Sequence, residues 1–155
     1  MNSTIGIDPG AVTGIALLTD AGTTLYPKSF KWGKGGEAVF THLRGLAQLA
    51  PGEITAVIEK PAAPYYMRKV SLRANFKISQ NVGECKAKAM AISAFCQALG
   101  WKVIERPPIK GLTKLSVASW KAYFPKYVGR APSNHARDAS MLALWVRGNA
   151  GGAKP

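Results

Sequence analysis

Three short apolar runs at the start of the chain limit the folds that it can adopt. They cover residues 3–7, 14–19 and 23–32, with Asp-Pro-Gly at 8–10 and Asp-Ala-Gly at 20–22 between them. Because Gly, Pro and Asp favour tight turns, this pattern predicts three strands in an antiparallel meander.

Helices and further strands alternate in the rest of the chain. Apolar side chains recur every three or four residues over 37–49 and 82–99, which predicts two amphipathic helices. The other expected elements are strands over 54–58 and 101–105 and helices over 117–124 and 133–147. This order predicts an α/β domain with a mixed five-stranded sheet and helices on both faces. It resembles the arrangement of RNase H-like domains.

A single domain accounts for the 155 residues. We assign residues 1–150 to it and expect residues 151–155 to be a disordered tail. Cys85 and Cys96 fall on one expected helix, about 16 Å apart along its axis, which is too far for a disulfide. Both are expected in the core. With no secretory leader and no membrane-spanning apolar run, a cytoplasmic location is expected.

The whole chain has a net charge of +13, and its basic residues are concentrated in the later part. Residues 1–59 carry four basic and five acidic side chains, whereas residues 60–155 carry seventeen basic and three acidic ones. This asymmetry predicts a surface that binds a polyanion such as a nucleic acid. A basic surface that serves only solubility is the alternative.

Two acids, Asp8 and Glu59, stand at the ends of separate apolar strands. The polar end of a buried strand holds a side chain firmly while solvent still reaches it. Each acid also has a structural explanation, since Asp8 suits a turn and Glu59 suits a solvated strand end. The expected helix over 133–147 adds His135 and Asp138, three residues apart and therefore on one face. Asp138 could instead serve the helix dipole, and His135 could be a capping or surface residue.

Three carboxylates gathered together would repel one another unless cations lay between them. Asp8, Glu59 and Asp138 offer oxygen ligands, which suit Mg²⁺ or Mn²⁺. Two such ions about 4 Å apart support the hydrolysis of phosphodiester bonds. The sequence therefore predicts a two-metal nuclease site.

The same segments resemble the RuvC family of Holliday-junction resolvases. The match comprises Ile-Gly-Ile-Asp-Pro-Gly at 5–10, Thr-Gly-Ile-Ala at 13–16, Val-Ile-Glu at 57–59 and Asn-His-Ala-Arg-Asp-Ala at 134–139. The resemblance spans nearly the whole chain in the family's order. It implies a homodimeric endonuclease that cuts opposed strands of a four-way DNA junction.

By this resemblance, Asp8 would bridge both metal ions, and Glu59 and Asp138 would complete the two sites. His135 would bind a metal ion or position the attacking water, and one carboxylate fewer favours Mn²⁺. The helix over 82–99 would contribute to the dimer interface, although its stripe could equally pack on its own sheet. One departure concerns Ala62, which stands where well-known bacterial members carry a base-stacking aromatic residue; Tyr65 or Tyr66 could substitute.

Two basic segments are candidates for binding DNA. The first lies between 60 and 80, carries no acid, and includes aromatic residues that could stack on bases or fill the core. Its candidate residues are Lys60, Tyr65, Tyr66, Arg68, Lys69, Arg73 and Lys77, with Phe76 also in the segment. In the second segment, Lys110 and Lys114 loosely match basic residues that are important for catalysis in the family. Arg106, Lys121, Lys126 and Arg130 extend that segment along the expected duplex arms.

Other functions share parts of the pattern. Sugar kinases and actin-like phosphotransferases also open with Asp-x-Gly-x-x-x-Gly, matched here by Asp8, Gly10 and Gly14. Their fold needs two such domains around ATP, and a nucleotide does not explain the basic charge. A DNA-binding module without catalysis would not need the full acidic set. A related nuclease that cuts other branched DNA or RNA is the remaining alternative.

Overall fold

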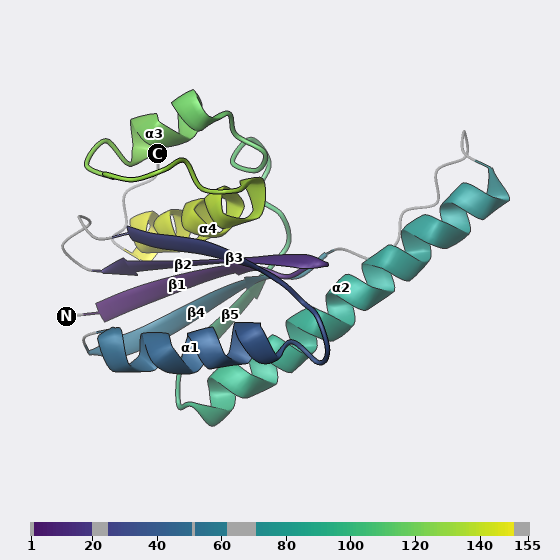
Figure 1. Cartoon of the computed structure of the whole chain (residues 1–155), viewed down its shortest axis with the longest axis horizontal. Helices are drawn as coiled ribbons and strands as arrows, with labels where there is room; N and C mark the ends of the chain where they lie inside the picture. Colours follow the sequence, from purple (N-terminus) through teal and green to yellow (C-terminus); the bar gives the residue numbers. More distant parts are fainter. Residues whose placement is uncertain (1, 20–24, 51, 62–70, 151–155) are drawn as a thin grey trace.

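The computed structural model of the chain describes residues 2–19, 25–50, 52–61 and 71–150 (Figure 1). Within them, five strands and four helices follow one another along the chain. They are β1 (Asn2–Asp8), β2 (Val12–Thr19), β3 (Leu25–Lys31), α1 (Glu37–Leu49), β4 (Glu53–Glu59), α2 (Leu72–Ala98), β5 (Lys102–Arg106), α3 (Val117–Tyr123) and α4 (Asn134–Ala150).

The strands form a single mixed sheet in the order β3-β2-β1-β4-β5. Strand β2 pairs antiparallel with both β1 and β3, which is the expected meander. Strands β4 and β5 extend the sheet in parallel with β1. The predicted mixed five-stranded sheet is therefore confirmed, and its strand order and directions fit the predicted RNase H-like arrangement.

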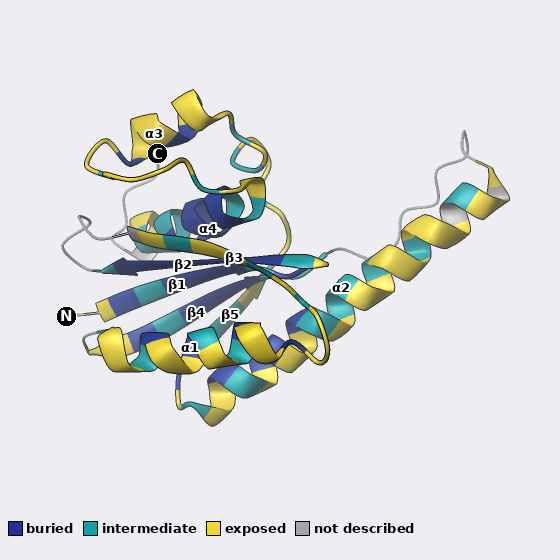
Figure 2. Cartoon of the chain, in the orientation of Figure 1, coloured by how far each residue is buried: buried dark blue, intermediate teal, exposed yellow. Residues whose placement is uncertain are grey.

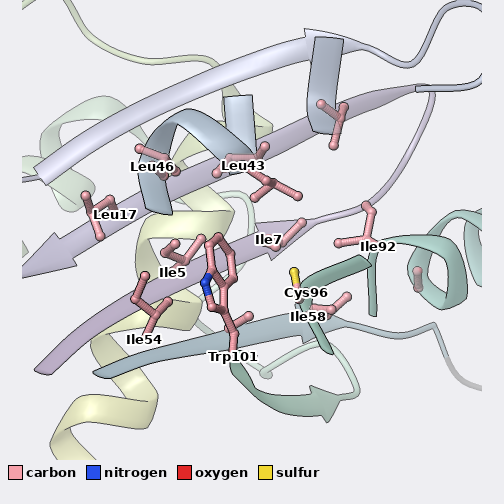
Figure 3. Close-up of a cluster of buried hydrophobic side chains, with 14 residues drawn as sticks. Ile5, Ile7, Leu17, Leu43, Leu46, Ile54, Ile58, Ile92, Cys96 and Trp101 are labelled. Atoms are coloured by element: carbon pink, nitrogen blue, oxygen red, sulfur yellow. The ribbon is translucent and has the colours of Figure 1, made fainter. Parts of the chain in front are cut away.

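Helices cover both faces of the sheet, α1 and α2 one face and α3 and α4 the other (Figure 1). The larger core lies between the sheet and helices α1 and α2, and it contains isoleucines of β1, β2 and β4 (Figure 3). Cys96 is fully buried in this core, as expected. A smaller core holds Trp120 and Phe124 against α4 on the opposite face.

Two glycines allow α4 to lie unusually close to the central strands. A Cβ atom at Gly6 of β1 would collide with the backbone carbonyl of Ala139, and one at Gly14 of β2 would collide with that of His135. Both α4 residues lie near the beginning of that helix. These contacts fix how closely the beginning of α4 approaches the end of β1.

The expected start of the second helix was wrong, because α2 begins at Leu72 rather than at 82. Its C-terminal half packs under the sheet through Ala89, Ile92 and Cys96. Its N-terminal half projects from the body and is mostly exposed (Figures 1 and 2). An apolar stripe marks only the packed half, so periodicity could not reveal the rest. Ser71, whose hydroxyl accepts a hydrogen bond from the Ala74 N–H, caps the true beginning.

The other boundaries agree with expectation to within a few residues. Residues 23–24 of the third expected strand and the expected tail at 151–155 lie outside the described residues. In the described part of the chain, none of the helices has the length and apolar character needed to cross a membrane.

The close approach of α4 leads to a prediction about Gly6. The substitution Gly6→Ala should lower the free energy of unfolding by about 2–4 kcal/mol, because the rigid backbone of α4 cannot yield to the added methyl group. Chemical denaturation monitored by circular dichroism measures this change. Gly45→Ala is the matched control, since nothing lies near that position in α1 and alanine favours helix. Equal stability of the two variants would contradict the proposed packing constraint.

Candidate active site

The sheet places Asp8 and Glu59 at neighbouring strand ends. Ile7 of β1 pairs with Ile58 of β4 in parallel register, so the next residue of each strand is an acid. Side chains alternate along a strand, and Ile7 and Ile58 point into the core beneath α1 and α2. Asp8 and Glu59 therefore point to the face that α4 covers.

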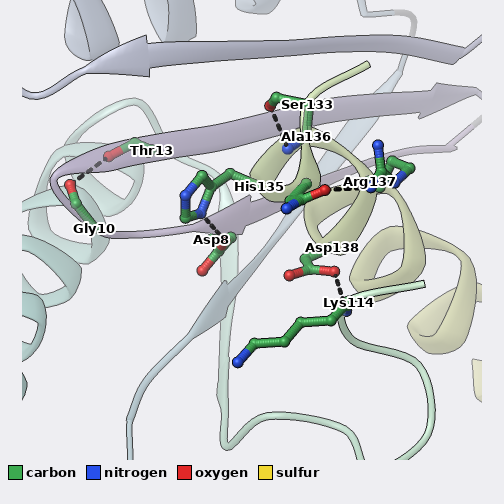
Figure 4. A network of polar contacts seen from close by, with 10 residues as sticks. Asp8, Gly10, Thr13, Lys114, Ser133, His135, Ala136, Arg137 and Asp138 are labelled. Carbon is green, nitrogen blue, oxygen red and sulfur yellow. Dashed lines mark hydrogen bonds and ion pairs between the residues drawn. The ribbon is translucent and has the colours of Figure 1, made fainter. Parts of the chain in front are cut away.

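The first turn of α4 brings His135 to Asp8. The Ser133 hydroxyl accepts a hydrogen bond from the Ala136 N–H and so caps the helix. His135 Nδ1 lies 2.9 Å from Asp8 Oδ2, a contact across 127 positions of sequence (Figure 4). The Asp8 side chain is only 13% exposed, whereas the His135 side chain is 46% exposed. The imidazole therefore lies between the largely buried carboxylate and solvent.

Arg137 anchors this helix turn from the opposite side. Its guanidinium donates to the carbonyl of Pro132 at 2.7 Å and to that of Leu115 at 3.1 Å, and also to the Asn134 side chain. These bonds tie the beginning of α4 to the segments before it. His135 is thereby held at a defined place beside the strand ends.

Asp138 is engaged by the segment between β5 and α3. Its Oδ1 accepts a 2.8 Å hydrogen bond from the backbone N–H of Lys114 (Figure 4). Lys114 has a φ of 56°, a left-handed conformation that is uncommon for residues other than glycine. Asp138 therefore lies in the network around α4, although it is not one of the residues that line the cleft described below.

Burial and mutual repulsion raise the pKa values of Asp8 and Glu59. Burial and the charges of Asp8 and Asp138 together raise the pKa of Glu59 to about 7. Its Oε2 is buried without a hydrogen-bond partner among the described residues. Burial also raises the pKa of Asp8, while the bond and charge of His135 oppose that rise and Asp138 adds to it. The three predicted carboxylates are thus close enough to influence one another.

A cleft of about 420 Å³ opens beside these side chains. Asp8, Glu59 and His135 line one side of it, and residues of α2 line another. The residues of α2 are Asn81, Glu84, Cys85 and Lys88, none of which the sequence had suggested for the site. The expectation that Cys85 is a core residue was wrong: it is half-buried and faces the cleft, because α2 passes the strand ends there.

The donor chemistry of the site fits a divalent cation, but the side chains do not form a finished metal site as they stand. In the described part of the chain, no group of three or more His, Cys, Asp or Glu residues is arranged to hold a metal ion. Asp8 and His135 bond to each other instead. The unpartnered oxygen of Glu59 and the crowded charges are what a cation would relieve.

The predicted DNA-binding residues fall into three groups. Tyr65, Tyr66, Arg68 and Lys69, together with Ala62, lie outside the described residues. Arg73 and Lys77 are exposed on the projecting half of α2, and Lys110 and Lys114 are exposed between β5 and α3. Lys60 Nζ forms a 2.6 Å salt bridge with Glu105 at the edge of the sheet.

Comparisons with known proteins add little to this geometry. No protein-family model matches the chain, and no curated protein matches it. Among solved structures, the chain is similar to YeaZ from Pseudomonas aeruginosa, at 12% identity and a TM-score of 0.40. The match covers 79% of this chain and 48% of that one, so the chain spans about half the length of its structural match. A likeness this weak supports no conclusion about function.

The raised pKa of Glu59 leads to a prediction about stability. The folded protein holds this proton more tightly than the unfolded chain, so stability is lost as pH rises from 4.5 towards 7. Glu59→Gln should therefore raise the Tm at pH 8 in EDTA, by about 2–4 °C per kcal/mol of relieved strain, and have less effect near pH 4.5. Calorimetry at both pH values measures the difference.

The matched control is Glu53→Gln, which removes an exposed acid from the other end of β4. It should change the Tm by a similar small amount at both pH values. A Glu59→Gln effect that does not depend on pH would argue against the strained carboxylate.

Proposed function

We propose that this protein is a metal-dependent endonuclease that hydrolyses phosphodiester bonds in branched DNA. The proposed substrate is the four-way (Holliday) junction, and the proposed relatives are the RuvC resolvases. The activity would take place inside the cell, where such DNA occurs. The supporting observation is that Asp8, Glu59 and His135 line one cleft at the ends of β1 and β4, with Asp138 near enough to raise the pKa of both acids.

Electrostatics makes a cation the natural partner of this cluster. Asp8 and Glu59 both have raised pKa values, and Asp138 adds to each shift. Carboxylates held this way bind hard cations such as Mg²⁺ or Mn²⁺ through oxygen. Two bound ions would supply an activated water and neutralise charge on the departing 3′ oxygen.

The residues of the chain would have separate tasks. Asp8 and Glu59, fixed by the sheet, would hold the ions, with Asp138 as a further ligand. His135 would orient Asp8 or ligate an ion, because its ring already contacts that carboxylate. Rotation of the part-exposed ring would release Asp8 for metal binding.

The surface charge is consistent with a DNA substrate. The chain has a net charge of +13, although Asp8, Glu59 and Asp138 gather at the site. Arg73 and Lys77 are exposed cations on the projecting half of α2, and Lys110 and Lys114 are exposed cations between β5 and α3. Such residues would grip phosphates and hold the backbone against the acids. A homodimer would present two sites to opposed strands of a junction.

Cleavage of synthetic substrates tests this proposal. With Mg²⁺ or Mn²⁺, the protein should nick a four-way junction at paired, symmetric positions, and Asp8→Asn should reduce the rate at least about a hundredfold because a charged metal ligand is lost. Denaturing gels with each strand labelled in turn measure the cuts. Glu53→Gln, which removes an acid far from the cluster, is the control.

The outcomes separate the candidate activities. Equal cutting of junction, fork, flap and duplex would leave a general nuclease. Cutting of an RNA substrate instead would move the proposal to a related RNA nuclease. No cutting of any substrate with either metal would refute the enzyme assignment.

His135 should set the metal preference. With imidazole in place of a carboxylate, the site should favour Mn²⁺, and His135→Asp should shift the preference several-fold towards Mg²⁺. Rates at matched metal concentrations measure this shift. Metal-induced changes in Tm provide a readout without turnover. Wild-type activity that is no better with Mn²⁺ than with Mg²⁺ would contradict the role given to His135.

A further inference from the structure

Helix α2 supplies a second wall to the candidate active site. Asn81, Glu84, Cys85 and Lys88 are spaced three, four and seven positions along the helix, so they share one face. That face lines the same cleft as Asp8, Glu59 and His135. The only Lys or Arg among the described residues that line this cleft is Lys88.

The Lys88 side chain is mostly enclosed, but its ammonium group has no close ionic partner among the described residues. It is 16% exposed, and its Nζ lies 4.0 Å from Glu84 Oε2, too far for a normal hydrogen bond. The partner acid is itself 57% exposed. The ammonium also lies 5.8 Å from the centre of the Trp32 ring. A weak ion pair and an aromatic face hold the group without satisfying its donors.

An ammonium that borders the cleft and makes only a long contact with an acid suits an anion. The Lys88 Nζ lies 4.0 Å from Glu84 Oε2, so its hydrogen-bond donors can turn to a phosphate that enters the cleft. Lysine offers three donors on a point charge, which suits the oxygens of a phosphate. A phosphodiester in the cleft would lie between this ammonium and the acids on the sheet.

We propose that the Lys88 ammonium binds a non-bridging oxygen of the phosphodiester to be cut. This inference rests on the proposed nuclease function and assigns a phosphate-positioning residue to the same site. Lys88 holds the backbone from the α2 side, while Asp8 and Glu59 face it from the sheet. The phosphate would replace the long contact between the ammonium and Glu84.

A structural role for Lys88 is the competing explanation. Its methylene chain could serve only to pack beside Trp32 and support α2 against the sheet. Lys88→Met separates the two roles, because methionine keeps an unbranched apolar side chain and loses the charge. Lys86→Met is the matched control, since it removes the same charge from the same helix at a position that does not line the cleft.

The test measures affinity for a four-way junction in Ca²⁺, after the cleavage position has been mapped with the wild type in Mg²⁺ or Mn²⁺. A second junction carries an uncharged methylphosphonate at that position. The wild type and Lys86→Met should each bind the modified junction about tenfold more weakly than the normal one. Lys88→Met should bind the normal junction about tenfold more weakly and lose less than about threefold further on modification.

Each result has a defined meaning. The smaller loss in Lys88→Met, with an unchanged Tm, supports the contact with that phosphate. Equal losses in the wild type and Lys88→Met overturn this inference and leave the nuclease function intact. A wild type that neither cuts nor binds the junction overturns the proposed function, and this inference with it.

Discussion

The close packing of α4 on the central strands is the constraint on which the candidate site depends. Gly6 and Gly14 leave room for the α4 backbone where any side chain would collide with it. That approach sets the distance from His135 to Asp8 at 2.9 Å. A larger residue at either glycine would lift the first turn of α4 from the sheet. These two glycines thus act on the site through backbone packing, since neither contributes a side chain to it.

The candidate site is acidic, whereas the molecule as a whole is strongly basic. The chain carries 21 basic side chains, yet Glu59 has a pKa of about 7 because burial and two nearby acids outweigh any stabilising cation. Evolution of a stable fold alone would not favour such a strained carboxylate. This repulsion would serve a function if a divalent cation bound there. The cation would neutralise the carboxylates and also attract the phosphates of a polyanionic backbone.

Sequence reasoning predicted most of the fold because its signals were local. Short alternating runs, turn residues and the stripe over 82–99 fix the order of strands and helices, and strand ends located Asp8 and Glu59. The face shared by His135 and Asp138 also followed from helical spacing. The hydrogen bond from the Lys114 backbone N–H to the Asp138 side chain could not be predicted, because it joins segments whose relative position depends on tertiary packing.

The role of α2 shows most clearly what periodicity cannot reveal. A helix that is packed at one end and exposed at the other carries an apolar stripe over only part of its length, so its beginning at Leu72 was missed. The cleft lies where the packed half passes the strand ends. Polar residues there interrupt the apolar pattern, and sequence alone cannot distinguish them from a solvated face. Cys85 and Lys88 line the cleft only because α2 packs against β4 and β5, which long-range packing determines.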